Sequence, residues 1–404
     1  MILSDIVICG GALSGLTAAL ALQKLNMEIL IIDPLTIEEI IKKDKRTTAI
    51  AAGPGKFYLE KGVWQLLEGK AESINKINIK DGNSGFQLDF DYNEIKESLR
   101  SKLVTNLGYV VENSHLLQSI NNIIKNNGKK TPVKRIKAKV ISIEKKEEDL
   151  AKIKLDNGKI VLASLIIAAD GRNSVIRKMS GIEEKKLDYE QYAFVCQIQH
   201  KNFHQNIALE KFLPGGPLAI LPMIKNEKSY RSSIIWSDNK EVSMGRFNSA
   251  RHDPKRIAYE LERHSFEWLG RIESLSSSAV YPLQLIRAKN VVAERFVLIG
   301  DAAHGLHPIA GQGFNLTIRD IKIFTELCKK RVLLGLDIGS EKFLKDYEKI
   351  RRADILGLVL ATHSLNKLFS IKKSPIKLFR KIGMSAIQKS PYIKRIFMRY
   401  AMGL

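Results

Sequence analysis

Residues 5–33, DIVICGGALSGLTAALALQKLNMEILIID, contain the pattern that decides the fold. A short apolar run ends at Cys9, a glycine-rich turn follows, and residues 14–26 have a helical composition. A second apolar run, residues 28–33, ends in an aspartate. Strands that alternate with helices predict a parallel sheet, so we expect an α/β domain built on this unit.

The turn itself, residues 10–15 (GGALSG), predicts a dinucleotide site. Gly10 permits the tight turn from strand to helix, and Gly15 lets the helix lie close to the strand. The N-terminus of the helix then offers free N–H groups and the positive end of its dipole to a pyrophosphate. Asp33 lies eighteen residues after Gly15, where it can accept hydrogen bonds from an adenosine ribose. Ala12 replaces the usual middle glycine, which slightly tightens the approach of backbone to phosphate.

Two later segments each end an apolar strand at an aspartate next to a glycine. They are SLIIAADG, which contains Asp170, and RFVLIGDAAH, which contains Asp301. The second segment continues through a Pro/Gly loop into a helix that begins near Gly313. Asp301 can bind the hydroxyls of a ribityl chain, and the dipole of that helix can stabilise the negative charge of a reduced flavin. These two segments therefore favour FAD over NAD.

Four segments resemble the ubiquinone-biosynthesis FAD-dependent hydroxylases, class A flavoprotein monooxygenases with the para-hydroxybenzoate hydroxylase fold. They are RTTA (46–49), LGYVVEN (107–113), ADGRNS (169–174) and HPIAGQGFNLTIRD (307–320), of which the last is highly specific for the family. The tail, residues 365–404, also resembles the ending of that family, so the likeness runs nearly end to end. The resemblance implies a Rossmann-type FAD-binding domain, an antiparallel β-sheet substrate domain and a helical C-terminus.

The resemblance also implies an activity. Enzymes of this family hydroxylate the aromatic ring of a polyprenylated phenol, as 2-polyprenyl-6-methoxyphenol hydroxylases do, through a flavin C4a-hydroperoxide. FAD is then the cofactor and O₂ the co-substrate, and the electrons come from NAD(P)H or from a separate reductase. The phenol and other ubiquinone-biosynthesis proteins are the implied partners. An apolar pocket formed by an antiparallel sheet, lined by residues 214–222, suits such a substrate.

The family pattern implies an FAD site assembled from several segments of the chain. Its residues are Gly10, Ala12, Gly15, Asp33, Arg46, Asn113, Asp170, Asp301, Gly313, Phe314 and Asn315. Arg46 is expected near the flavin and the substrate entrance, unless it is a surface arginine, and Asn113 either touches the cofactor or is a plain loop residue. His304 and His307 suggest a catalytic role, which we do not adopt, since His307 precedes Pro308 in a tight loop and is equally suited to hold that loop in shape. No side chain is identified as the base for the phenol, and no metal-ligand spacing such as HExxH occurs.

The division of the chain into domains follows from a change in pattern. Residues 185–280 contain alternating, strand-like stretches with a turn at PGGP, and the chain becomes helical from about residue 340. We expect a discontinuous FAD-binding domain of residues 1–70, 100–184 and 281–350, a substrate-binding sheet domain of residues 71–99 and 185–280, and a basic helical region of residues 351–404.

The composition leaves two alternatives to test. Lys and Arg number 65 against 43 Asp and Glu, a net charge of +22, which reflects either a lysine-rich bias or an anionic partner. Nucleic acid is not expected, because only 7% of residues are aromatic and no helix-turn-helix or zinc pattern occurs. The closer alternative is an FAD-dependent reductase or dehydrogenase of the same fold that acts on a prenyl lipid, but such an enzyme should lack HPIAGQGFN.

Location is predicted from the cysteines, the first apolar segment and the tail. Three widely spaced cysteines suit a reducing cytoplasm. Residues 6–22 are uncharged, but they contain three glycines and follow no basic segment, so we expect neither a signal peptide nor a span. After Asp354 no acidic residue occurs, and ten Lys or Arg lie between Lys367 and Arg399. This tail is either a docked helix pair with a basic outer face or an amphipathic surface that lies on the inner membrane. Another basic stretch, residues 125–139, is interpreted as a solvated loop before a strand.

Overall fold

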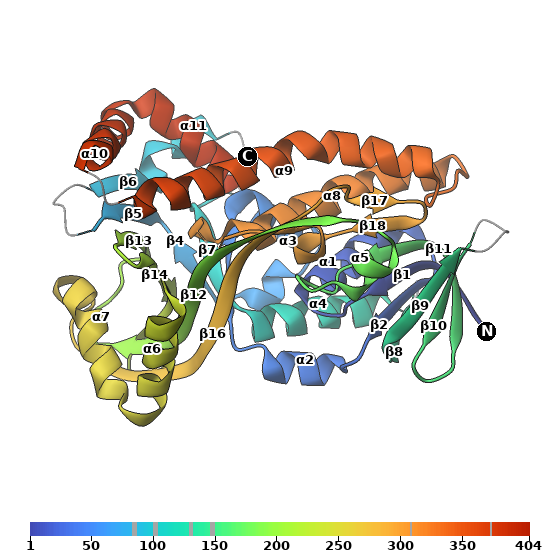
Figure 1. Ribbon diagram of the computed structural model, residues 1–404, viewed down its shortest axis with the longest axis horizontal. Helices are drawn as coiled ribbons and strands as arrows, with labels where there is room; N and C mark the ends of the chain where they lie inside the picture. Colours follow the sequence, from blue (N-terminus) through green and yellow to red (C-terminus); the bar gives the residue numbers. More distant parts are fainter. Residues whose placement is uncertain (83–86, 100–103, 129–131, 146–149, 308, 372–373) are drawn as a thin grey trace.

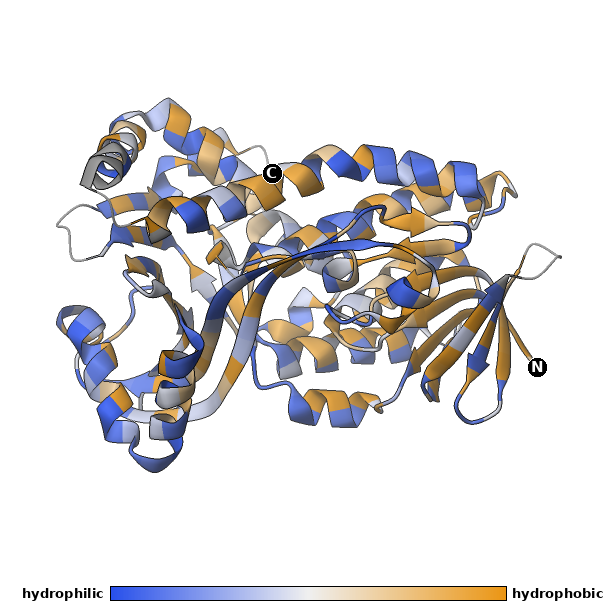
Figure 2. Ribbon diagram, viewed as in Figure 1, coloured by the Kyte–Doolittle hydropathy of each residue, from blue (hydrophilic) through white to orange (hydrophobic). Residues whose placement is uncertain are grey.

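A parallel sheet with β1 (Ile2–Cys9) as its middle strand organises the first half of the computed structural model (Figure 1). The structure describes residues 1–404 except 83–86, 100–103, 129–131, 146–149, 308 and 372–373. β1 pairs in parallel with β2 (Ile29–Asp33) on one side and with β11 (Ile160–Ala168) on the other. Residues 6–8 of β1 have no exposed surface, as expected for a strand that is covered on both faces. Figure 2 shows the hydrophobic colouring of these strands.

The order of the remaining strands decides which residues lie together at one edge of this sheet. They are β8 (Val133–Lys137), β9 (Val140–Lys145), β10 (Ala151–Leu155), β17 (Val292–Ala293) and β18 (Phe296–Leu298). The order is β17-β18-β11-β1-β2-β8, and β10 and β9 extend antiparallel from β11. Because β1, β11 and β18 are parallel neighbours, Gly10, Asp170 and Asp301, which follow these strands, lie at the same edge.

Helices alternate with the strands along the chain, and a further helix follows the last strand, which confirms the predicted α/β class. They are α1 (Leu13–Leu22), α2 (Ile37–Lys43), α3 (Ala52–Glu60), α4 (Asn113–Asn127), α5 (Val175–Met179) and α8 (Gln312–Leu333). α1 packs against both α4 and α8. Nine of the ten residues of α1 are buried, which explains why its sequence is apolar on all sides.

A second, mostly antiparallel sheet lies beyond the first. Its order is β19-β16-β12-β15-β14-β13-β5-β6. The strands are β5 (Lys76–Asp81), β6 (Gln87–Asp91), β12 (Glu184–His200), β13 (Ile207–Leu213), β14 (Gly216–Met223), β15 (Tyr230–Asp238), β16 (Ile272–Ala288) and β19 (His304–Gly305). β12 and β16 are 17 residues long each, and they run as a paired ribbon from the parallel sheet into the other lobe (Figure 1). The predicted antiparallel pattern and the hairpin at PGGP are confirmed.

Residues 185–280, predicted as an antiparallel sheet insert, do not consist of strands throughout. This segment also contains two helices, α6 (Lys240–His252) and α7 (Pro254–Leu269). Ile257, Leu261 and Leu269 of α7 are fully buried against one face of the second sheet. The start signals of both helices are in the sequence, since Asn239 caps α6 through the N–H of Val242 and Pro254 occupies the first turn of α7.

A small third sheet joins the two larger ones. It consists of β3 (Thr47–Ala51), β7 (Gly108–Glu112) and β4 (Ala71–Ile74), in the order β3-β7-β4. Of the predicted substrate segment 71–99, β5 and β6 lie in the second sheet whereas β4 lies in this one. The exact domain boundaries therefore remain a prediction.

The C-terminal region is helical, as predicted, and it packs on the body. α9 (Glu341–Ser370) has 30 residues and is followed by α10 (Ser374–Lys389) and α11 (Pro391–Met402). In α11, Met398 and Met402 belong to a buried apolar cluster of the body. The docked helix pair expected as one alternative is therefore present. No helix in the described part of the chain is both long and apolar enough to cross a membrane.

Candidate FAD site

Two glycines bring α1 closer to the sheet edge than any side chain would allow. A Cβ on Gly15 would lie 1.8 Å from the carbonyl oxygen of Gly10. A Cβ on Gly10, whose φ is +105°, would lie 2.4 Å from the carbonyl oxygen of Ala169. Both distances are far below van der Waals contact, so the close approach of helix and strand that the turn predicts is present.

The N-terminus of α1 has the properties of an anion site. Its N-cap, Ala12, provides no side-chain hydrogen bond to the first turn, so the backbone donors of that turn are left for a ligand. Asp33 lies beside this turn at the end of β2, where its carboxylate accepts hydrogen bonds from the N–H of Gly11 at 2.6 Å and from that of Leu35 at 2.8 Å. The predicted pyrophosphate and ribose residues are thus neighbours.

Arg135 also lies at this end of the site, although no motif in the sequence indicates it. The stretch 125–139 was interpreted as a loop, but residues 133–137 form β8, next to β2. Arg135 donates to the carbonyl oxygen of Gly11 at 2.9 Å, and a Cβ on Gly11 would collide with its guanidinium. Burial lowers the pKa of Arg135, although the Asp33 charge opposes this effect. A half-buried cation at this turn suits the phosphates or the adenosine of a dinucleotide.

Asp170 and Asp301 follow neighbouring strands, but their partners differ. Asp170 accepts hydrogen bonds from Ser174 and from the N–H of Val175, so it caps the start of α5. Asp301 is about two-fifths exposed and accepts a hydrogen bond from Nε of Arg172 at 3.0 Å. Asp301 therefore keeps an oxygen at the surface of the edge, as a ribityl ligand requires, whereas the carboxylate of Asp170 is committed to its own turn.

Arg46 and Asn113 are held together by Asp44, an aspartate that no predicted motif contains. The carboxylate of Asp44 accepts hydrogen bonds from Nε and Nη2 of Arg46, at 2.8 and 2.7 Å, and from the amide nitrogen of Asn113, at 3.0 Å. Burial acts to raise the pKa of Asp44, but the hydrogen bonds and the charge of Arg46 outweigh it, so the pKa is lowered. The guanidinium of Arg46 lies 5.9 Å from the ring centre of Tyr281 in β16. Arg46 thus lies between the start of β3 in the third sheet and β16 in the second sheet.

The N-terminus of α8 completes the edge. Its N-cap, Gly311, has a φ of +61° and provides no side-chain cap. Asn315 accepts from the N–H of Ala51 at 2.9 Å and donates to the carbonyl oxygen of Ala49 at 3.0 Å, so it fixes α8 to β3. A Cβ on Gly313 would meet nothing within 4 Å, which leaves open space beside this turn. Phe314 is partly buried and packs on the main core.

The two helix N-termini converge around Gly300. A Cβ on Gly300 would lie 2.8 Å from Oγ of Ser14 in α1 and 3.2 Å from Oγ1 of Thr317 in α8. One sheet edge thus carries two uncapped helix N-termini, with Asp33 at the β2 end and Asp301 beyond β18. An elongated dinucleotide with an anionic middle fits this arrangement. Pro308, in the predicted flavin-side segment, lies outside the described residues.

Of the two histidines in that segment, His304 is part of a buried ion-pair network. Its Nε2 contacts Asp320 of α8, which also accepts Nε of Arg351 from α9 at 2.7 Å. Burial acts to raise the pKa of Asp320, but the charges and hydrogen bonds of His304 and Arg351 lower it. The network fastens α9 to α8, and His304 is one of its members.

Comparisons with known proteins agree with this geometry. The family model described as "FAD binding domain" matches residues 4–360. The chain is 34% identical to the ubiquinone hydroxylase UbiL of Rhodospirillum rubrum, over 99% of this chain and 90% of that protein. It is 28% identical to the 3-demethoxyubiquinol 3-hydroxylase of Escherichia coli, over 99% of each chain.

Solved structures share the fold. The p-nitrophenol 4-monooxygenase PnpA from Pseudomonas putida superposes with a TM-score of 0.79 at 16% identity, over 98% of this chain and 97% of that one. PqsL from Pseudomonas aeruginosa superposes with a TM-score of 0.75 at 15% identity, over 94% of this chain and all of the other. At this level of identity the likeness concerns the fold.

Proposed function

Because the chain belongs to the FAD-binding-domain family and, within it, to the ubiquinone hydroxylases, we propose that it is an FAD-dependent monooxygenase that hydroxylates the ring of a polyprenylated phenol in ubiquinone biosynthesis. The observation that carries the proposal is the full-length likeness to a named ubiquinone hydroxylase. The sheet edge supports it, because its two uncapped helix N-termini suit a dinucleotide. Bound FAD supplies the electron transfer and the O₂ chemistry of such a reaction.

The cofactor is proposed to lie along the edge from β2 to α8. The first turn of α1 receives the pyrophosphate, Asp33 and Arg135 lie at the adenosine end, and Asp301 binds the ribityl hydroxyls. The N-terminal turn of α8, at Gly313 and Asn315, faces the flavin ring, and its dipole stabilises negative charge there. Asp44 orients Arg46 beside this position through its two hydrogen bonds.

The substrate is proposed to lie between α8 and the second sheet. Alternate residues of β12, β14 and β15 pack against α6 and α7, so the residues between them face the other side. That second face meets β3, since Oγ1 of Thr47 donates to Oγ of Ser233 at 2.7 Å. Val195, Leu221 and Ile235 belong to this face, and their apolar side chains suit a prenylated ring and exclude water from the reaction.

The electron source and the location belong to the same proposal. Electrons come from NAD(P)H or from a separate reductase, and O₂ is the co-substrate. A polyprenylated phenol partitions into lipid, so the enzyme meets it at the inner surface of the membrane. Basic residues and exposed apolar side chains of α10 and α11 provide that contact.

Complementation tests the proposed function directly. The gene is expressed in bacterial strains that are each blocked at one ring hydroxylation of ubiquinone biosynthesis, and the accumulated precursors are identified by mass. We expect one strain to regain ubiquinone and to lose its unhydroxylated precursor, whereas a Gly15→Val variant restores none. Restoration of no strain, together with a prenyl chain that gains two hydrogens, would favour a prenyl-lipid reductase instead.

A further inference from the structure

His307 is a buried histidine with one nitrogen left over. His307 is 1% exposed, and it lies between β19 and the N-terminal turn of α8. Its Nε2 lies 3.3 Å from Oε1 of Gln191 in β12. Its Nδ1 is buried, and no described residue forms a hydrogen bond with it.

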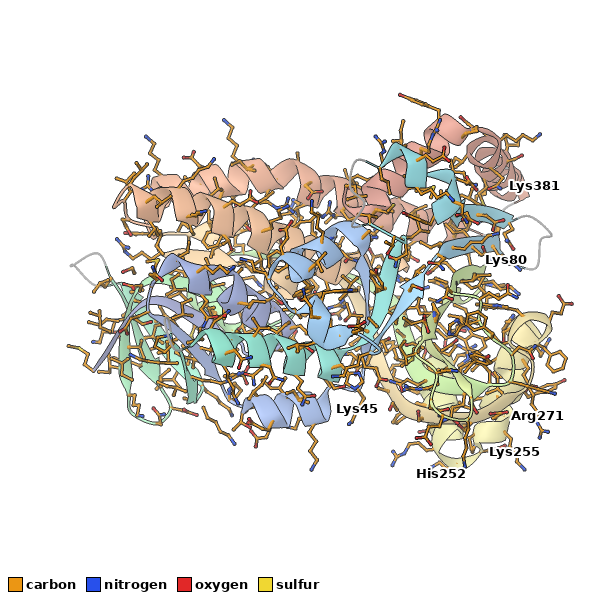
Figure 3. All side chains as sticks on the ribbon, turned by 180° about the vertical axis from the view of Figure 1, so that it is seen from behind. Lys45, Lys80, His252, Lys255, Arg271 and Lys381 are labelled. Carbon is orange, nitrogen blue, oxygen red and sulfur yellow. The ribbon has the colours of Figure 1, made fainter. Side chains whose placement is uncertain are left out.

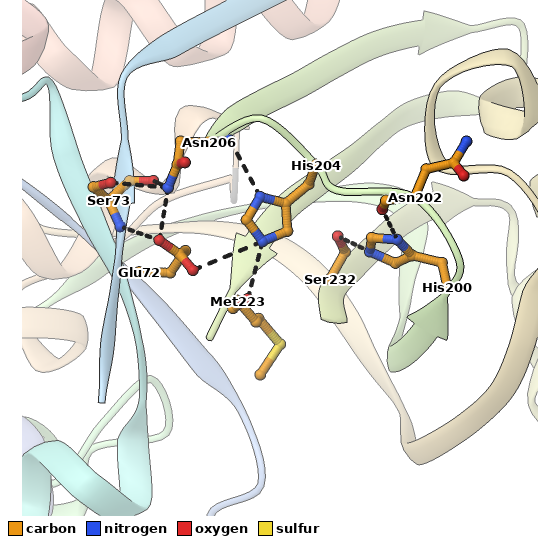
Figure 4. Close-up of polar contacts among 8 residues, drawn as sticks. All are labelled: Glu72, Ser73, His200, Asn202, His204, Asn206, Met223 and Ser232. Carbon is orange, nitrogen blue, oxygen red and sulfur yellow. Dashed lines mark hydrogen bonds and ion pairs between the residues drawn. The ribbon is translucent and has the colours of Figure 1, made fainter. Parts of the chain in front are cut away.

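Two other buried histidines use both ring nitrogens, whereas Nδ1 of His115, like that of His307, has no partner among the described residues. His200 and His204 each use both ring nitrogens (Figure 4): His200 contacts Ser232 and the carbonyl oxygen of Asn202, and His204 contacts the carbonyl oxygen of Met223 and the N–H of Asn206. His304 also has an unused Nδ1, but Asp320 and Arg351 fix its ring inside the α8–α9 network. Among the described residues, none forms an ion pair with His307.

The neighbours of His307 decide where its proton lies. The amide nitrogen of Gln191 donates to the carbonyl oxygen of Gly215 at 3.1 Å, which turns its oxygen toward the imidazole. Nε2 of His307 must therefore carry the hydrogen that Gln191 accepts. Burial, assisted by the charge of Arg172, lowers the pKa of His307 to about 3, so the ring is neutral and Nδ1 is a bare acceptor.

The position of this acceptor matches the proposed reaction. Gln191 belongs to β12, Gly215 belongs to the hairpin before β14, and α8 begins five residues after His307. The ring of Tyr189 closes another side, with ring centres 5.1 Å apart at 85°. His307 therefore lies at the junction of the flavin-side loop with the substrate sheet.

We propose that Nδ1 of His307 accepts the hydrogen bond of the phenolic hydroxyl of the substrate and so orients the ring for hydroxylation. This inference rests on the proposed function. A phenol supplies the one donor that this buried acceptor lacks, and leaving such an acceptor unsatisfied is costly. So weakly basic an imidazole orients the hydroxyl without removing its proton. The site is thus expected to discriminate strongly against a ring without the hydroxyl.

A matched pair of variants separates the two ring nitrogens. His307→Asn keeps an acceptor near the position of Nδ1 and loses the donor to Gln191. His307→Gln keeps a donor near the position of Nε2 and loses the acceptor. The measurement is ligand binding to the oxidised holoenzyme, without turnover. The change in flavin absorption is recorded while a short-chain prenylated phenol, or its deoxy analogue, is added.

We expect the parent to prefer the phenol by roughly tenfold or more, His307→Asn to retain most of this preference, and His307→Gln to bind both ligands equally. The reverse order of the two variants would show that His307 only ties its loop to Gln191. If the unsubstituted protein binds the phenol and its deoxy analogue equally, the inference is overturned, even if neither variant folds. The FAD content of each variant measures whether it has folded. A product assay stands apart: if no prenylated phenol is hydroxylated, the proposed function fails, whatever the binding preference.

Discussion

At the scale of single residues, the site depends on positions where an added side chain has no room. Gly15 is the strictest, because its Cβ would lie 1.8 Å from a carbonyl oxygen and 3.2 Å from Cγ2 of Ile8. Gly15→Val should push α1 away from β1 and from the pyrophosphate position. We expect insoluble or flavin-free protein, measured by soluble yield and FAD content. Gly245→Val is the matched control, since Gly245 lies in α6 with nothing within 4 Å of a Cβ. Equal flavin in both variants would contradict the dinucleotide site.

Asp301 tests the ribityl end of the same site. Asp301→Ala removes an acceptor, at a cost of about 1–3 kcal/mol, so FAD should dissociate roughly tenfold more easily or more, as measured by fluorescence titration of the apoprotein. The variant also removes a partly exposed ion pair with Arg172. Asp337→Ala is the control, because Asp337 is equally exposed and pairs with Arg295 at the same distance of 3.0 Å. Loss of affinity in both variants would assign the effect to general destabilisation.

At the scale of elements, α7 makes the second lobe sensitive to acid. His264 of α7 packs against Trp236 of β15, and burial, followed by the charges of Lys211, Arg263 and Arg246, lowers its pKa from 6.5 to about 4. The unfolded chain therefore binds more protons than the folded one between these values. This contribution to stability is complete above pH 6.5 and is lost as the pH falls toward 4.

Urea unfolding between pH 8 and pH 5 measures the effect. The ring is only half-buried and solvent screens the charges around it. We therefore expect His264→Gln to reduce the loss of unfolding free energy between pH 8 and pH 5 by about 1 kcal/mol. Glutamine keeps an acceptor for Lys211, which lies 3.4 Å from Nδ1. His252→Gln, at an exposed position of α6, should leave the pH dependence unchanged. A parent whose stability is the same at pH 8 and pH 5 would contradict the sign of this prediction.

The elements that the sequence predicts well are those whose signal is local. β1, α1 and β2 follow from one stretch, since the glycines, the apolar runs and Asp33 all lie within residues 5–33. The parts that were missed depend on distant contacts. Arg135 reaches Gly11 only because β8 adds to the sheet beside β2, and Asp44 matters only because the chain brings Asn113 back to it.

Helix α6 was missed for a different reason. α6 buries a single residue, Ser243, so its sequence carries almost no helical apolar period. The free nitrogen of His307 could not be foreseen either, since it depends on the amide orientation of Gln191, which Gly215 fixes from another strand.

At the scale of the whole molecule, positively charged side chains occur on several elements, whereas α11 exposes a row of apolar side chains. The Lys and Arg residues labelled in Figure 3 lie on α10, on β5, beside α2, and on or next to α7. On α11, Lys394 and Arg399 contact Glu94 and the carbonyl oxygen of Ser98 in the body. The opposite side exposes an apolar face, which comprises Tyr392, Ile393, Ile396, Phe397 and Tyr400. Exposed Lys381, Lys389 and Arg395 lie near it in the sequence, a pattern typical of helices that lie on anionic lipid.

This outer face should bind vesicles that contain phosphatidylglycerol, and the binding should weaken as salt is added. Each Lys or Arg near an anionic surface contributes about 1 kcal/mol of electrostatic binding free energy, and salt screens this attraction. Truncating the tail would remove Met398 and Met402 and expose the body residues of their buried cluster, so point changes are the better test. Ile396→Glu with Phe397→Glu should weaken co-sedimentation by roughly 10- to 100-fold, from lost apolar burial and added negative charge. Tyr259→Glu with Phe266→Glu, equally charged changes at exposed positions of α7, should have little effect while flavin is retained. Equal losses in both pairs, or binding indifferent to salt, would leave α11 as a packed cap without a membrane role.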